Sequence, residues 1–283
     1  MRLFWSPEYV GGEEDTLAKS AKVIDIVRND PNITIQRPHR AEVSELVLAH
    51  SETYIEDVFA RRVGAGVSVT DKSVLSVRYS TGGIIEAALE AAGSGGNSGS
   101  ASSGLHHARR DGGYGFCTFN GLAVAARVVG HEWAESGEDQ PRIHIVDLDA
   151  HCGGGTWDIL KGDDNVTCSD VSVDRYDEYT PDRGDWVLSH VTDPERYLKT
   201  VQRSLPERSF DLVLYNAGMD PWEGSGVGGL EGITAEMLAE RDAMVFEWAR
   251  TFKSPVAFVF AGGYGDLDAI AALHAGTVRL AAA

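Results

Sequence analysis

The sequence has few cysteines and no long apolar run. Only three of its 283 residues are cysteine, and no two of them form a Cys-x-x-Cys pair. An odd number of widely spaced cysteines argues against a disulfide framework and favours a reducing compartment. Because no stretch reaches about 18 consecutive apolar residues, a membrane-spanning helix is not expected. We therefore expect a cytoplasmic protein without a membrane partner.

Basic residues are also scarce. The chain has 25 lysines and arginines against 43 aspartates and glutamates, which gives a net charge of −18. Contact with nucleic-acid phosphates requires a basic surface, so we expect no nucleic-acid partner. The acidic balance either attracts cationic ligands or serves solubility alone. The content of 43% hydrophobic and 24% charged residues is typical of a globular protein, and we expect a single domain over residues 1–283.

Short apolar runs rich in β-branched residues alternate with helical patterns along the chain. The runs predict buried parallel strands over residues 143–146, 166–173, 210–215 and 256–260. The helical patterns cover residues 121–129, 194–204 and 234–252. This alternation predicts an α/β fold, in which a mostly parallel sheet carries helices on both faces.

Three further segments have weaker patterns. Residues 73–92 predict a helix over their second half, and residues 162–185 have few helix signals, so we expect this second segment to be largely loop. Residues 93–104 read GSGGNSGSASSG. This composition is typical of a flexible loop, and we expect it to be mobile over a functional site.

Polar sequence follows three of the predicted strands, at the positions where open α/β sheets bind ligands. The first strand runs into Asp147, Asp149 and His151, which share one face of an extended segment because they alternate. Two carboxylates and an imidazole destabilise one another when buried unless a cation neutralises them. A solvated turn is the alternative interpretation. We assign Asp149 and His151 as ligands of zinc or ferrous iron.

Other polar residues complete this set. Asp220 follows another predicted strand and is a candidate third ligand, with a helix cap or a turn as the alternative. His106 and His107 suit proton transfer near neutral pH, or are polar surface residues. Tyr264, which follows Gly263, either donates a hydrogen bond to an oxyanion or packs on the core.

In this order the motifs resemble the metal-dependent histone deacetylase family, which includes the bacterial acetylpolyamine amidohydrolases. The segments that carry the resemblance are His106-His107, Gly115-Phe116-Cys117, Asp147-x-Asp149-x-His151, Gly218-Met219-Asp220 and Gly262-Gly263-Tyr264. Residues 50–55 and the C-terminal residues 267–277 resemble the family too, so that the resemblance covers most of the chain.

The resemblance implies the arginase–deacetylase fold, a single three-layer α-β-α domain. It implies a zinc site, or a ferrous iron site, made by Asp149, His151 and Asp220. It also implies a structural potassium ion beside the same strand, with contributions from Asp147, Asp149, His151, Ser172 and Val173.

The resemblance further implies roles for the residues around the metal. His107 would be the general base and His106 its electrostatic partner, which Asp147 orients. Tyr264 would stabilise the oxyanion. The residues expected to line the substrate site are Gly115, Phe116 and Gly263.

The sequence departs from the family pattern at Gly154, where the family places an Asp or Asn that partners the general base. A catalytically impaired relative, which binds acylated ligands or a protein partner, is therefore an alternative. A two-metal arginase-like hydrolase is a weaker alternative. Gly153 stands where the arginase branch of the fold has a further Asp, and no Asp directly precedes Asp220, where Ala217, Gly218 and Met219 stand.

The resemblance and the site residues together predict a metal-dependent amidohydrolase. It would remove an acetyl or other short acyl group from an amine such as acetyl-lysine or an acetylpolyamine, releasing acetate and free amine. The expected partner is a small-molecule or acyl-lysine substrate, and the sequence is compatible with a homo-oligomer.

Overall fold

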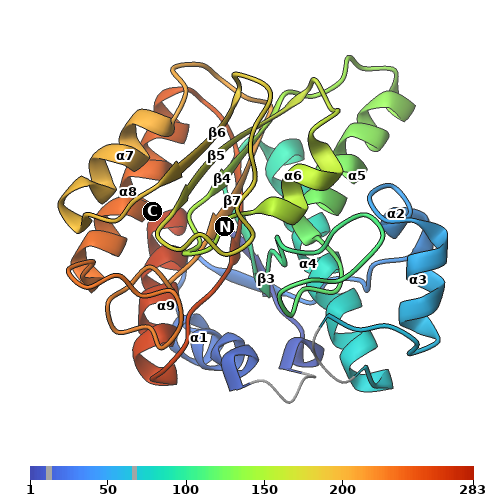
Figure 1. Ribbon diagram of the computed structural model, residues 1–283, viewed down its shortest axis with the longest axis horizontal. Helices are drawn as coiled ribbons and strands as arrows, with labels where there is room; N and C mark the ends of the chain where they lie inside the picture. Colours follow the sequence, from blue (N-terminus) through green and yellow to red (C-terminus); the bar gives the residue numbers. More distant parts are fainter. Residues whose placement is uncertain (11–14, 66–68) are drawn as a thin grey trace.

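A parallel β-sheet runs through the centre of the computed structural model, which describes residues 1–10, 15–65 and 69–283 (Figure 1). Its strands follow the order β2-β1-β3-β8-β7-β4-β5-β6, and each neighbouring pair is parallel. The strands are β1 (Arg2–Phe4), β2 (Thr34–Gln36), β3 (Ser98–Ser103), β4 (Ile143–Asp147), β5 (Val166–Ser172), β6 (Trp186–His190), β7 (Leu212–Ala217) and β8 (Val256–Phe260).

Helices cover both faces of the sheet. One layer contains α1 (Lys19–Val27), α7 (Tyr197–Ser204), α8 (Ala235–Thr251) and α9 (Leu267–Ala282). The opposite layer contains α2 (Val43–Leu46), α3 (Glu52–Phe59), α4 (Asp71–Ser94), α5 (Gly121–Ser136) and α6 (Gly154–Leu160). Short 3-10 helices span Pro7–Val10, Asp15–Ala18 and Pro194–Arg196. No helix of the described ranges combines the length and the apolar character that a membrane span requires.

The central strands show why the layers form. Successive side chains of a strand point to opposite faces, and on β7 Val213 and Tyr215 join one hydrophobic cluster while Leu212 and Leu214 join the other. Such a strand is apolar on both faces and is stable only between two helical layers. The predicted α/β class, with a parallel sheet between helices, is confirmed.

Most of the predicted elements are present, with shifted ends. The runs predicted as strands correspond to β4, β5, β7 and β8, and the segment 162–185 is loop on either side of β5. Helix α4 is longer than predicted. It begins at Asp71, because Thr70 Oγ1 caps it by accepting from Ser73 N at 3.1 Å. It ends before Gly95, whose φ of 72° suits a left-handed cap.

The prediction of a flexible loop over residues 93–104 is wrong. Strand β3 lies inside the sheet, between β1 and β8, and its small residues are required by close packing. A Cβ atom at Gly99 would lie 2.3 Å from the ring of Phe258. The serine hydroxyls are bonded internally: Ser100 Oγ lies 2.8 Å from Ser102 Oγ, and Ser102 Oγ donates to Ser80 O at 3.0 Å. A composition typical of a linker here forms a buried strand.

We expect Gly99→Ala to destabilise the protein by about 1–3 kcal/mol, because the added methyl group overpacks the contact with Phe258. Denaturant unfolding measures this change. Gly93→Ala is the matched control, because a Cβ there meets no atom within 4 Å and alanine favours the helix by roughly 0.5–1 kcal/mol. Equal stability of both variants would argue that β3 is not packed as described.

A buried histidine in the sheet makes stability depend on pH. His144 bonds Thr167 Oγ1 at 2.7 Å and Ser169 Oγ at 3.1 Å, and burial lowers its pKa to about 3. The folded protein therefore favours the neutral ring. This preference stabilises the fold fully above about pH 6.5, the pKa of histidine in the unfolded chain. It is lost as the pH falls below that value.

We expect the His144 effect to contribute about 2 kcal/mol to the loss of stability between pH 7.5 and 5. In His144→Gln, which stays neutral, the loss over this range should be smaller by that amount. Urea unfolding of both proteins at the two pH values tests this, and an identical pH dependence would contradict it.

Candidate active site

The predicted metal ligands converge at the carboxyl edge of the sheet, where β4 and β7 end side by side. Asp149 and His151 follow β4, and Asp220 follows β7. All three side chains are buried, and one ligand atom of each lies within 4.8 Å of the others. His151 Nδ1 is 3.0 Å from Asp149 Oδ1 and 3.2 Å from Asp220 Oδ2. The structure thus brings the three residues together as the sequence predicted.

The donor set fits a divalent cation. Asp149 Oδ2 accepts from Gly262 N at 2.8 Å, and Asp220 Oδ1 accepts from Ala150 N at 2.9 Å, so backbone amides fix both carboxylates. Asp220 Oδ2 is fully buried without a hydrogen bond. A buried carboxylate oxygen without a donor is costly unless a cation neutralises it. Two carboxylates and one imidazole suit zinc or ferrous iron.

The charges of this group are strongly interdependent. Burial raises the pKa of Asp220, the charge of Asp149 adds to this effect, and the pKa reaches about 6. Burial lowers the pKa of His151, but the hydrogen bond to Asp149 and the nearby carboxylate charges of Asp149 and Asp220 outweigh it and raise the value to about 11. The imidazole therefore carries the positive charge that a metal ion would otherwise supply, and metal binding must release its proton.

Glycines allow the carboxylates to lie this close to the backbone. A Cβ at Gly262 would lie 1.9 Å from Asp220 Oδ2, and one at Gly218 would lie 2.6 Å from Asp149 Cα. Gly262 O also accepts from Met219 N at 2.8 Å, which joins the ends of β7 and β8. The glycines of these two motifs are therefore steric requirements of the site.

The two histidines that follow β3 are buried beside the metal ligands. His106 Nδ1 bonds Asp147 Oδ2 at 2.8 Å, and its Nε2 lies 3.1 Å from His107 Nε2. Burial lowers the pKa of His106, but the charges of Asp147 and Asp149 outweigh this and raise it to about 10. Burial and the positive charge of His106 lower the pKa of His107 to about 4. One ring is therefore cationic at neutral pH and its neighbour is neutral.

Residues of two other segments hold the loop that carries His106 and His107. Asn120 caps α5 by accepting from Ala123 N at 3.0 Å, and its Nδ2 donates to His106 O at 3.1 Å. His50 accepts from Asn120 N at 3.0 Å through Nε2 and donates from Nδ1 to Arg109 O at 2.9 Å. These contacts hold the backbone on both sides of the histidine pair.

Asp177 is a site residue that the sequence analysis missed. Its Oδ2 lies 3.0 Å from His107 Nδ1, and its side chain is buried. It lies in the loop after β5, 70 positions from His107, within a segment expected to be loop. No local motif surrounds it, and only its acidic character distinguished it in the sequence.

Asp147, Ser172 and Val173, which the implied potassium site would use, form hydrogen bonds within the protein. Asp147 Oδ1 accepts from Asn216 Nδ2 at 2.8 Å, and its partner on β5 is Asp170. Burial and the charge of Asp147 raise the pKa of Asp170. Ser172 Oγ lies 3.2 Å from Cys152 Sγ, and Val173 N donates to the backbone. The potassium site therefore stays a prediction.

A sequence model of the histone deacetylase domain matches residues 15–280. This chain belongs to the histone deacetylase family. The predicted family is thereby confirmed.

Individual relatives agree with this assignment. Histone deacetylase 2 of Arabidopsis thaliana is 30% identical over 254 residues, which are 81% of this chain and 63% of that protein. A probable deacetylase of Methanothermobacter thermautotrophicus is 30% identical over 185 residues, 62% of this chain and 54% of that protein. The chain thus spans less than two thirds of the length of these relatives.

A solved structure shows the same fold. The crystal structure of the HDA15 HD domain superposes with a TM-score of 0.80, covering 99% of this chain and 90% of that one. The two sequences share only 17% identity, so this likeness concerns the fold alone.

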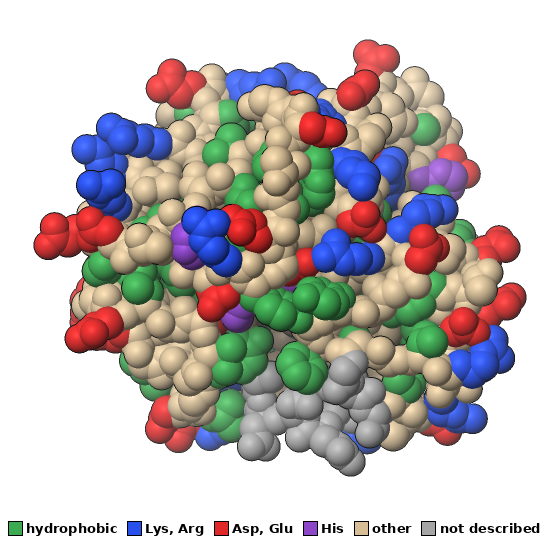
Figure 2. Space-filling model, in the orientation of Figure 1, with side chains coloured by type: hydrophobic (Ala, Val, Ile, Leu, Met, Phe, Trp, Pro, Cys, Tyr) green, Lys and Arg blue, Asp and Glu red, His purple; other side chains and the backbone are tan. Residues whose placement is uncertain are grey.

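Aromatic side chains border the site of this deacetylase-family protein. Tyr114 and Tyr176 stack with ring centroids 5.3 Å apart and an interplanar angle of 7°. Tyr176 also meets His107 edge-on at 5.1 Å. A Cβ at Gly115 would lie 2.7 Å from the His107 ring, while Phe116 is 64% exposed. Figure 2 shows hydrophobic side chains gathered near the centre of this face, with acidic and basic ones interspersed around them.

The loop after β8 carries Gly263 and Tyr264. Gly263 has a φ of 155°, and a Cβ there would lie 2.9 Å from Ile270. Tyr264 is partly buried, and its backbone N lies 3.4 Å from Ser225 Oγ. A side chain at position 263 would therefore clash with α9, so glycine is a steric requirement of this loop.

Two buried cations outside the predicted set support the site. Arg241 on α8 donates to Gly218 O at 2.6 Å and to Leu148 O at 3.3 Å, which holds the ends of β7 and β4. Asp242 balances its charge through a bond of 2.7 Å. Lys19 on α1 donates to Ala261 O, and burial lowers its pKa to about 8.

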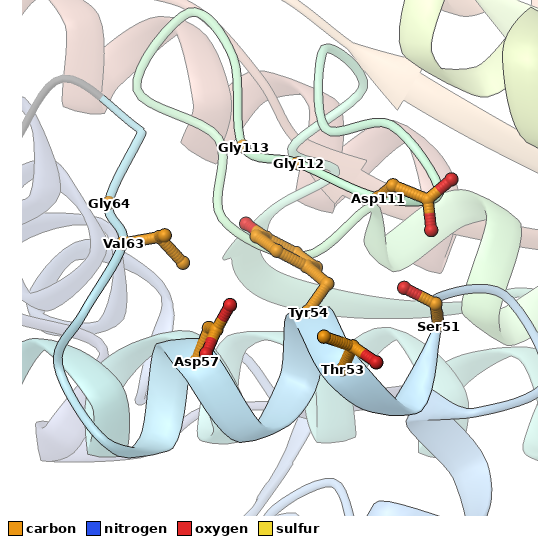
Figure 3. A pocket seen from close by; sticks show the side chains of 9 residues that line it. All are labelled: Ser51, Thr53, Tyr54, Asp57, Val63, Gly64, Asp111, Gly112 and Gly113. Carbon is orange, nitrogen blue, oxygen red and sulfur yellow. The ribbon is translucent and has the colours of Figure 1, made fainter.

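A separate surface cavity lies between α3 and the loop that follows the histidines (Figure 3). Its volume is about 460 Å³, and Tyr54, Asp57 and Asp111 are among its lining residues. None of the predicted metal or catalytic residues lines it. Tyr54 in its wall donates to Thr118 O at 2.8 Å, so that this residue of the 50–55 segment has a structural role.

We expect Gly262→Ala to lower metal affinity by at least about 10–100-fold, because the new methyl group displaces the Asp220 carboxylate. Metal content after dialysis against dilute chelator measures the effect, with circular dichroism to verify folding. Gly276→Ala on α9 is the control, since a Cβ there meets nothing within 4 Å. Full metal content in Gly262→Ala would refute the steric argument.

Proposed function

We propose that this protein is a metal-dependent deacetylase, which hydrolyses the amide bond of an acetylated amine to acetate and free amine. The buried group of Asp149, His151 and Asp220 carries the proposal, together with the neutral His107 beside it. A divalent ion in this group would polarise the amide carbonyl and make water a better nucleophile.

His107 is the proposed general base. A neutral imidazole can accept the proton of the attacking water, whereas a cationic one cannot. The lowered pKa of His107 keeps the ring neutral at physiological pH. His106 stays protonated between the carboxylates of Asp147 and Asp149, and its charge stabilises the negative charge that develops on the reacting carbonyl.

Tyr264 and a histidine complete the proposed reaction. The phenol of Tyr264 would donate a hydrogen bond to the oxyanion of the tetrahedral intermediate. When the carbon–nitrogen bond breaks, a protonated histidine gives its proton to the leaving amine. The water thus supplies the hydroxyl group of the acid, and its proton leaves on the amine.

The proposed substrate is acetyl-lysine or an acetylated polyamine. The names of the relatives, histone deacetylase and probable deacetylase, support the removal of an acetyl group. Zinc is the proposed ion, with ferrous iron as the second candidate for the same ligands. A structural potassium ion near Asp147 is a further proposal from the family resemblance.

The alternatives receive less support. The alternative of a catalytically impaired relative depends on Gly154, which offers no carboxylate to the general base. His107 nevertheless has a carboxylate partner, because Asp177 Oδ2 lies beside its Nδ1. A two-metal arginase-like site needs more carboxylates. Among the described residues, one cluster has metal-binding spacing, and it contains three ligands.

We expect the zinc-loaded protein to release acetate from an acetyl-lysine peptide or an acetylpolyamine. Asp149→Ala and Asp220→Ala should lose the metal. Tyr264→Phe should keep it and lower kcat by roughly 10²–10³-fold, the usual loss for one oxyanion donor. Coupled detection of acetate and metal analysis measure both quantities.

Tyr79→Phe, which changes a tyrosine on α4 that contacts Arg37, is the control. Full activity of Tyr264→Phe would refute its role. A folded protein with one bound ion that hydrolyses no acetylated amine would refute the proposed function.

A further inference from the structure

The carboxylate of Asp177 has three donors, and one of them is the proposed general base. Its Oδ2 accepts from His107 Nδ1 at 3.0 Å and from Gly155 N at 3.2 Å. Its Oδ1 accepts from Arg109 Nη2. The side chain is 1% exposed, so water does not compete for these bonds. Both oxygens are therefore in use, and the carboxylate is held in one orientation.

We propose that Asp177 is the positioning residue for His107, which fixes the tautomer and the orientation of its ring. This inference rests on the proposed function in so far as His107 acts as general base. Asp177 does not touch the metal ligands and acts on the reaction only through His107.

The bonding pattern determines the position of the proton on His107. A carboxylate accepts hydrogen bonds and donates none, so the proton of the neutral ring must lie on Nδ1, toward Asp177. The lone pair then lies on Nε2, which points toward His106 at 3.1 Å. This is the nitrogen on the side of the metal ligands, since His106 Nε2 is itself 3.6 Å from Asp149 Oδ1. A hydrogen bond of this kind commonly fixes the tautomer of a functional histidine.

Asp177 occupies the space that a side chain at position 154 would need. A Cβ atom at Gly154 would lie 2.4 Å from Asp177 O and 2.6 Å from Asp177 Oδ1. No side chain at position 154 is therefore compatible with the observed place of Asp177. Because position 154 has no side chain, the loop after β5 can place the carboxylate of Asp177 beside His107.

Arg109 anchors the carboxylate from the other side. Its Nη1 donates to Gly154 O at 3.1 Å while Nη2 binds Asp177, and its guanidinium lies over the Tyr114 ring at 5.3 Å. One side chain thus ties the start of α6 to the loop after β5. Its planar guanidinium and permanent charge suit the binding of a carboxylate.

The backbone conformation of Asp177 limits which substitutions can test its role without distorting the loop. Its φ is 59°, a left-handed conformation that Asp and Asn tolerate better than other residues with a side chain. Asp177→Asn therefore keeps the shape and the backbone but has only one oxygen. If this oxygen faces His107, the amide nitrogen faces Arg109, and both donors cannot be satisfied together.

We expect Asp177→Asn to lower kcat by about 10–100-fold, the usual loss for a residue that orients a functional histidine. KM should change less than about twofold and the zinc content should not change. Glu178→Gln is the matched control, since it removes the neighbouring exposed carboxylate of the same loop. Wild-type kcat in folded Asp177→Asn, or loss of its zinc, would overturn the proposal.

A second measurement does not depend on activity. Nitrogen-15 spectra of the histidines in the zinc-loaded wild-type protein should show His107 protonated on Nδ1 alone, with its signals identified by their loss in His107→Gln. Protonation on Nε2 would overturn the proposal. An Nδ1 tautomer in a protein that hydrolyses no acetylated amine would support the contact and refute the proposed function instead.

Discussion

The structure depends on bringing two carboxylates into a dry site and keeping them ionised. Asp149 and Asp220 lie almost fully buried at the ends of neighbouring strands, where an uncompensated charge is very costly. Backbone amides, the cationic His151 and a nearby lysine offset part of that cost. A divalent ion would offset more of it, because it places two positive charges between the ligand atoms.

The buried carboxylates also give the two adjacent histidines different protonation states. His106 faces the carboxylates of Asp147 and Asp149 and retains its proton. His107 lies beside the cationic His106 and is neutral, because burial and this positive charge lower its pKa. Identical side chains thus obtain pKa values of about 10 and about 4 from their surroundings alone. Such divergence between neighbouring groups is typical of sites where one group moves protons and the other stabilises charge.

Glycine and left-handed backbone make this density of polar groups possible. Gly262 and Gly218 let the strand ends approach the ligand carboxylates, and Gly154 leaves room for Asp177. At Gly262 and Gly154 the space of the missing side chain holds a carboxylate from another segment. The site is therefore assembled from several loops at one edge of the sheet. Residues of one loop fill the space that a side chain on another loop would need.

The sequence by itself determined the α/β class and the strands that carry the ligands, because apolar runs and the polar residues after β4 and β7 are local patterns. It did not predict the short strands β1, β2 and β6, and it misjudged β3, whose serines resemble a linker until Tyr9, Ser80 and Phe258 are packed around them. The partner of His107 likewise lay beyond local patterns. Only the tertiary structure, which joins segments 70 positions apart, decides which carboxylate faces which imidazole.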